Sequence, residues 1–146
     1  MKDTIKLHEI CGYLPYNLSI GYFFNGKHIC NAPMVSSMIY NSYADEIPLS
    51  IVVSGDESFK PLLRPLSDLT KEIEHNGKRF VPIVKLLQEY CFDTNQMTEQ
   101  EINEYAESMI EIDMSYMTAQ MLMEWHFDIH GLINRNLALN LNDYEI

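Results

Sequence analysis

Two Asn-Gly dipeptides constrain the fold of this chain more than any other feature of its sequence. A two-residue hairpin loop requires a positive φ at both central residues, which Asn and Gly tolerate better than other residues. The first dipeptide, Asn25-Gly26, separates two segments rich in strand-forming residues, 18–24 and 27–30. The sequence therefore predicts an antiparallel hairpin near the N-terminus.

The second dipeptide, Asn76-Gly77, is compatible with two structures. As a hairpin loop it would place charged and apolar partners across from each other, pairing His75 with Lys78, Glu74 with Arg79, and Ile73 with Phe80. The alternative is a helix over residues 67–75 that Gly77 ends. The complementary cross-strand pairs favour the hairpin.

The rest of the N-terminal half also has the composition of strands. Residues 34–40 and 47–53 predict two further strands. Residues 61–65 are expected to be extended, because each proline disfavours a helical conformation in the residue before it. A short helix over residues 4–14 precedes the first hairpin, and Ser67 can cap one helical turn.

From Pro82 onward the hydrophobic period becomes that of helices, and proline suits a first helical position. The apolar stripe of the first such helix consists of Ile83, Leu86, Leu87 and Tyr90. Thr98 and Glu101 form a capping box at the start of the next helix. Ser115 can cap a third helix that continues to about Phe127, and because it is apolar nearly all round, we expect it to be mostly buried.

Together these elements predict an α+β fold, with an N-terminal antiparallel sheet of hairpins and three to four C-terminal helices packed on one side. Residues 137–142 alternate with a period of two and predict a final strand that returns to the sheet. With 146 residues, of which 47% are hydrophobic, the chain is long enough to bury a core. We expect residues 1–146 to form a single domain.

The charge of the chain is concentrated in one segment. Between Lys85 and Arg135 there is no Lys or Arg, whereas the formal net charge of the whole chain is −11. The acids of this segment are Glu89, Asp93, Glu99, Glu101, Glu104, Glu107, Glu111, Asp113, Glu124 and Asp128. One surface of the folded protein should therefore carry a strong negative potential, which repels nucleic acid and attracts basic partners.

The helix after Thr98 is the centre of this acidic segment. Its apolar residues, Ile102, Tyr105, Ala106 and Met109, share one face. The predicted partner-binding residues, Glu101, Glu104, Glu107 and Glu111, lie on the opposite face and its edge. The simpler interpretation is a solvated helix surface, but such a surface ordinarily carries interspersed lysines, and this one has none.

Residue patterns for catalysis or metal binding are weak. His126 and His130 have the spacing of two ligands on one helix face, but no third ligand is evident, and aromatic packing near a helix end is the alternative. His28 and Cys30 share a strand face without a nameable third catalytic group. Phosphate-binding and nucleophile-elbow motifs are absent from the sequence. We therefore predict a protein that is not an enzyme and requires no cofactor or metal.

Cysteine usage and the N-terminus predict a cytoplasmic location. The three cysteines, Cys11, Cys30 and Cys91, are odd in number and widely spaced, which argues against a disulfide framework and favours small buried residues. The N-terminus lacks the apolar segment of a secretory signal, and no apolar run approaches the ~20 residues of a membrane span. We expect neither secretion nor membrane insertion.

Three separated stretches resemble a known group of proteins. They comprise residues 11–16, residues 61–82 around Pro61-Leu62-Leu63-Arg64-Pro65, and residues 124–142 around Glu124-Trp125-His126-Phe127-Asp128. This pattern resembles small uncharacterised proteins encoded by phages and prophages of gut Bacteroidetes. The chain departs from that pattern at Asn136, where Gly is usual, and residues 92–116 have no counterpart in it. The resemblance implies a phage context but no activity, and it makes the acidic surface particular to this chain.

Three functions are compatible with these observations. The first is a non-enzymatic phage or prophage accessory protein in the host cytoplasm, which binds a basic protein and could inhibit a host nucleic-acid enzyme. The second is a virion or assembly component. The third, a small metal-dependent or Cys/His enzyme, is the one that the residue patterns favour least.

Overall fold

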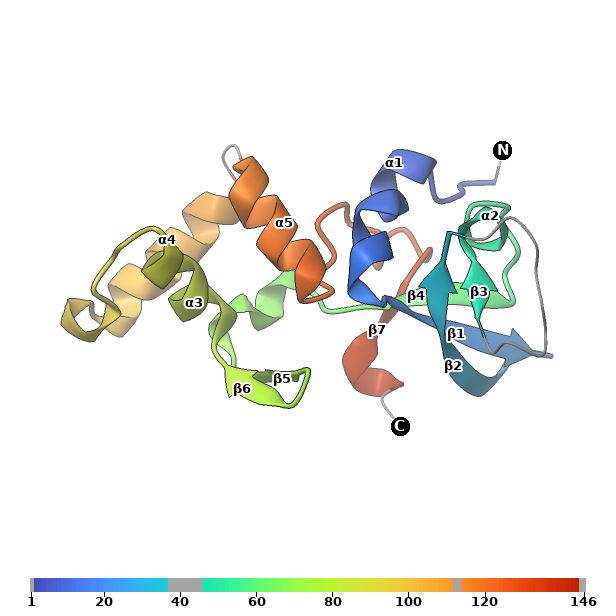
Figure 1. The fold of residues 1–146 in the computed structure, drawn as a ribbon, viewed down its shortest axis with the longest axis horizontal. Helices are drawn as coiled ribbons and strands as arrows, with labels where there is room; N and C mark the ends of the chain where they lie inside the picture. Colours follow the sequence, from blue (N-terminus) through green and yellow to red (C-terminus); the bar gives the residue numbers. More distant parts are fainter. Residues whose placement is uncertain (1, 37–45, 112–113, 145–146) are drawn as a thin grey trace.

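The computed structural model describes residues 2–36, 46–111 and 114–144, which form an α+β fold as predicted (Figure 1). A five-stranded sheet has the order β3-β2-β1-β4-β7, and a second sheet pairs β5 with β6. The strands are β1 (Ser19–Phe24), β2 (Lys27–Val35), β3 (Ile47–Pro48), β4 (Phe59–Leu63), β5 (Ile73–His75), β6 (Lys78–Phe80) and β7 (Leu139–Asn140).

The longer helices α3, α4 and α5 lie together to one side of the five-stranded sheet, next to the β5–β6 hairpin (Figure 1). The α-helices are α1 (Leu7–Ile10), α2 (Leu49–Val52), α3 (Pro82–Glu89), α4 (Glu99–Glu111) and α5 (Tyr116–Glu124). Short 3-10 turns are η1 (Cys11–Tyr16), η2 (Leu66–Thr70), η3 (Thr94–Gln96) and η4 (Leu141–Asp143). Within the described ranges, every helix is too short or too polar to cross a membrane.

Both Asn-Gly dipeptides form hairpin loops. Asn25 and Gly26 have φ angles of 52° and 75°, and Asn76 and Gly77 have φ angles of 52° and 78°. The β5–β6 register is the predicted one, pairing Ile73 with Phe80, Glu74 with Arg79, and His75 with Lys78. The helix considered as an alternative for residues 67–75 is therefore wrong.

The five-stranded sheet is mixed, although its centre is antiparallel as predicted. Strand β1 pairs antiparallel with both β2 and β4. The two edge strands are short and parallel to their neighbours, with β3 beside β2 and β7 beside β4. The final strand thus returns to the sheet as expected, placing Leu139 opposite Leu62.

The strand predicted over residues 47–53 is wrong after its first two residues. Pro48 has an extended conformation (φ −63°, ψ 141°), and the chain then turns into the four-residue helix α2. This turn brings Val52 into the same hydrophobic cluster as Ile47, which a continuous strand with alternating faces would not achieve. Of the strand predicted over residues 34–40, only the start is seen, within β2, because residues 37–45 lie outside the described ranges.

The predicted helix ends and burial need three corrections. Ser67 caps no helix, since η2 begins at Leu66 after Pro65 and has no side-chain cap. Helix α5 ends at Glu124, and only Thr118 and Leu122 within it are buried, because the helix packs along one side only. The cysteines expected in the interior, Cys11, Cys30 and Cys91, are free thiols on the surface.

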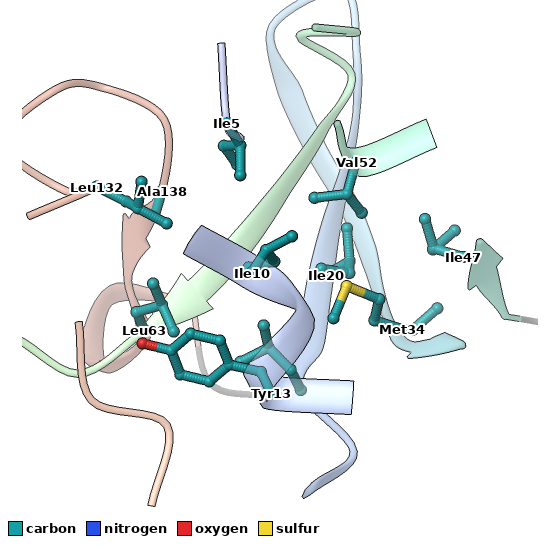
Figure 2. Close-up of a cluster of buried hydrophobic side chains, with 12 residues drawn as sticks. Ile5, Ile10, Tyr13, Ile20, Met34, Ile47, Val52, Leu63, Leu132 and Ala138 are labelled. Atoms are coloured by element: carbon teal, nitrogen blue, oxygen red, sulfur yellow. The ribbon is translucent and has the colours of Figure 1, made fainter. Parts of the chain in front are cut away.

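Two hydrophobic clusters hold the structure together. The first lies between the sheet and the N-terminal helical turns, where Ile10, Tyr13, Ile20 and Leu63 are fully buried (Figure 2). The second joins the helical group to the small sheet through Leu69, Ile73, Ile83, Leu86, Leu87, Ala106, Leu122, Trp125 and Phe127. The Tyr13 hydroxyl of the first cluster donates a hydrogen bond to the Phe127 carbonyl of the second, which links the two.

Helices α3 and α5 end in the same way, with a non-glycine residue at positive φ. After α3, Cys91 (φ 66°) donates its N–H to the Gln88 carbonyl and Phe92 donates its N–H to the Leu87 carbonyl, both at 3.0 Å. This arrangement is a Schellman motif. After α5, His126 occupies the equivalent position with a φ of 64°. A side chain in this conformation costs about 1–2 kcal/mol relative to glycine.

The Schellman motif after α3 gives a first prediction. Replacing Cys91 with Gly removes the strain that the Cβ causes at positive φ. The greater entropy of glycine in the unfolded chain offsets part of this gain. We expect the free energy of unfolding to rise by about 0.5–1 kcal/mol. Urea denaturation followed by circular dichroism measures it. Cys91→Ala is the matched control, because it removes the thiol but keeps the Cβ. Equal stability of the two variants would show that the backbone conformation is not strained.

Candidate functional site

The acidic surface predicted from the sequence lies on α4. Glu101, Glu104 and Glu107 are exposed there, whereas Ala106 on the opposite face is buried. Glu111 is the last residue of α4, and its side chain lies outside the described part of the structure. The three described acids define the acidic face of α4.

The start of α4 follows from the predicted capping box. The Glu101 N–H donates to Thr98 Oγ1 at 3.1 Å, and that hydroxyl donates to Glu101 Oε1 at 3.2 Å. Thr98 thus satisfies one free N–H of the first helical turn. The cap determines which residues begin the helix, and so which side chains form its acidic face.

The acidic face of α4 carries no neutralising partner among the ion pairs that the structure describes. Those pairs join Lys2 to Glu57, Lys71 to Asp68, Arg79 to Glu72 and Glu74, and Arg135 to Asp3 and Glu9. None includes a residue between Lys85 and Arg135, where the sequence has no Lys or Arg. The negative potential of the α4 carboxylates is therefore not offset by a described ion pair and can attract a basic partner.

An open cleft lies between the end of α3, the apolar edge of α4 and the start of α5. We call it the aromatic cleft, and its lining residues are Tyr90, Phe92, Tyr105, Met109, Met114, Ser115 and Thr118. The rings of Phe92 and Tyr105 lie 5.1 Å apart between centroids, and each side chain is 39% exposed. These two residues come from different segments, so sequence reasoning did not detect the cleft.

Exposed apolar side chains are concentrated in the segment that forms this cleft. Of the eight large hydrophobic residues exposed in the described ranges, five lie between residues 90 and 117. Three of the five, Tyr90, Phe92 and Tyr105, line the cleft. A concentration of exposed aromatic residues on one part of a surface is typical of a binding site.

Three hydroxyl groups form the polar side of the aromatic cleft. The Tyr90 hydroxyl hydrogen-bonds the Ser115 hydroxyl and lies 2.7 Å from Thr118 Oγ1. Ser115 Oγ also accepts from the Thr118 N–H at 3.2 Å, which caps α5 as predicted. The network joins the end of α3 to the start of α5 and holds the cleft in shape.

The two histidines considered as metal ligands, His126 and His130, contact different residues. Because α5 ends at Glu124, the four-residue spacing of His126 and His130 does not place them on one helix face. His126 Nε2 donates to the Tyr16 carbonyl at 2.6 Å, since a carbonyl oxygen only accepts, and the His130 ring packs edge-on against His8. Over the described ranges, no three His, Cys, Asp or Glu side chains are grouped as metal ligands.

The Cys/His pair on β2 is not arranged as a nucleophile and its base. His28 Nε2 lies 2.7 Å from Asn31 Oδ1, and its ring packs against Phe23 and Tyr144. The ring nitrogen is therefore engaged with an amide rather than with the Cys30 thiol, which is exposed.

Comparisons of the chain with models of protein families, with curated proteins and with solved structures find no match. The acidic face of α4 and the aromatic cleft are the two surface features of this chain that bear on its function. These two features adjoin each other on α4, because Tyr105 follows Glu101 by one helical turn.

The buried histidines give a second prediction, for stability against pH. Burial lowers the pKa of His126 to about 4, and burial together with the nearby Arg64 cation lowers the pKa of His75. In the unfolded chain a histidine has a pKa of about 6.5, so protonation favours unfolding as the pH falls below that value. From His126 alone we expect a loss of about 1 kcal/mol between pH 7.5 and pH 5.5.

Urea denaturation at the two pH values measures this loss. His126→Asn is the matched variant, because Asn tolerates the positive φ but does not titrate. The variant should lose less stability than the native chain over the same pH interval. If the variant and the native chain lost the same free energy of unfolding between the two pH values, the protonation of His126 would not be coupled to unfolding.

Proposed function

We propose that this chain is a non-enzymatic accessory protein of a phage or prophage, which binds a basic protein through the acidic face of α4. The observation that carries the proposal is the exposure of Glu101, Glu104 and Glu107 on one helix, in a segment of the chain without a single Lys or Arg. Such a surface attracts cations over long range and repels nucleic acid.

The spacing of these carboxylates suits an inhibitor of a nucleic-acid enzyme. Residues three apart on a helix are about 4.5 Å apart along its axis. One strand of DNA carries a phosphate charge about every 3.4 Å along its axis, so the two densities of charge are comparable. A host enzyme with a basic nucleic-acid groove is accordingly the partner class that we favour, and the host cytoplasm is where the two would meet.

A phage origin is supported by the sequence resemblance, which involves residues 11–16, 61–82 and 124–142. The acidic face of α4 lies outside all three stretches. A partner-binding surface that differs between related phage proteins would allow each to bind the enzyme of its own host. The proposal therefore concerns this chain and does not extend to the whole group.

The third prediction tests the acidic face of α4. A pull-down from host lysate should capture a basic protein at low salt and release it at high salt, since exposed charge pairs are screened by ions. The triple variant Glu101→Gln, Glu104→Gln and Glu107→Gln should lower the affinity for that protein at least tenfold. Isothermal titration calorimetry with the purified partner measures the affinity.

The control variant replaces three acids outside α4 with Gln, so it removes the same amount of negative charge as the triple variant. Glu57, Glu72 and Glu74 are exposed and belong to surface ion pairs, so their replacement with Gln should leave the fold and the affinity nearly unchanged. Binding that resists salt, or equal losses in both triple variants, would refute the role of α4. Stable homo-oligomers without any captured partner would favour an assembly component instead.

A further inference from the structure

We infer that the aromatic cleft receives an arginine side chain of the basic partner. This inference rests on the proposed function and specifies the residue that the partner inserts. The cleft combines aromatic rings and hydroxyl groups with an exposed carboxylate, that of Glu101, one helical turn from Tyr105. Each of these three features selects among the side chains that a partner could present.

The charge around the cleft selects a cation. Glu101 precedes Tyr105 by one helical turn and is exposed on the same edge of α4. No Lys or Arg lies between Lys85 and Arg135 to offset it. An anionic side chain would be repelled here, and an aliphatic one would gain nothing from the field.

The walls of the cleft select a flat cation. Phe92 and Tyr105 are tilted by 56° to each other and are both partly exposed. A guanidinium group stacks on aromatic faces and is weakly hydrated, so it gains more there than the strongly hydrated ammonium of lysine. The walls therefore distinguish arginine from lysine, which the acidic face of α4 alone does not.

The hydroxyl groups can complete the recognition of the guanidinium. Tyr90 and Ser115 present hydroxyl oxygens that accept hydrogen bonds, and arginine offers five N–H donors in a fixed plane. Because Ser115 and Thr118 begin α5 while Tyr90 ends α3, the oxygens come together only in the folded protein.

The aromatic cleft is formed in the free protein. The Tyr90 hydroxyl is hydrogen-bonded to Ser115 and Thr118 at the start of α5. The Phe92 N–H donates a hydrogen bond to the Leu87 carbonyl in the Schellman motif. Tyr105 lies in the middle of α4, where its ring packs against that of Phe92. Little conformational entropy is then lost on binding, which favours affinity.

The fourth prediction compares two fluorescent peptides, deca-arginine and deca-lysine, which carry equal charge. Fluorescence anisotropy at one fixed ionic strength should show about fivefold tighter binding of deca-arginine to the native chain. The double variant Phe92→Leu and Tyr105→Leu keeps apolar side chains but removes the rings. It should lose this preference while binding deca-lysine as before.

Two further variants distinguish the contribution of the cleft to peptide binding from that of the acidic face of α4. In the chain with Glu101, Glu104 and Glu107 changed to Gln, both peptides should bind more weakly by the same factor, so the preference for arginine persists. Tyr105→Phe retains the ring and should retain the preference. Circular dichroism and urea denaturation establish that each variant is folded, which is expected because the changed side chains are exposed.

The outcomes distinguish the two proposals. Equal binding of both peptides to the native chain, or a preference that survives loss of both rings, overturns the arginine site and leaves the charge-based function standing. Failure of both peptides to bind at low salt refutes the proposed function, and the arginine site with it.

Discussion

The buried guanidinium of Arg64 is the interaction on which the rest of the structure depends. Its Nε donates to the Trp125 carbonyl at 3.1 Å and its Nη2 donates to the Glu74 carbonyl at 2.8 Å. The backbone of Arg64 also exchanges hydrogen bonds with His126 and Asp128. A buried charge is tolerated only where hydrogen bonds replace its hydration. The end of β4, the β5–β6 hairpin and the segment after α5 must therefore meet in one geometry.

Residues 11–16, 61–82 and 124–142 form three stretches that are joined by hydrogen bonds in the interior of the fold. The Tyr13 hydroxyl reaches the Phe127 carbonyl, the Tyr16 carbonyl accepts from His126, and Arg64 pairs with Phe127 in an isolated bridge. These contacts are internal, so the three stretches contribute to the interior of the fold. The acidic face of α4 and the aromatic cleft lie outside the three stretches, on residues 90–118. The residues of the acidic face and of the aromatic cleft can therefore change without disturbing these buried contacts.

Local signals explain which elements could be predicted. Both hairpins, the Thr98 cap and the Ser115 cap depend on residues within a few positions of each other, and the structure contains all four. The strand predicted over residues 47–53 failed because packing of Val52 on the first cluster decided its conformation. The helix predicted to continue to about Phe127 ends at Glu124 in a Schellman motif, so His126 and His130 share no helix face. Both differences come from interactions that helical or strand periodicity does not express.

The sequence by itself determined the hairpins, the starts of α3, α4 and α5 and the concentration of negative charge, since turn chemistry, capping and charge are properties of neighbouring residues. Only the tertiary structure decided the parallel edges of the sheet, the burial of Arg64 and the aromatic cleft. Each of these brings together side chains or strands distant in sequence. Phe92 and Tyr105 illustrate the difference, because the pattern of α4 predicts the apolar edge that holds Tyr105, but only packing of α3 against α4 places Phe92 beside it.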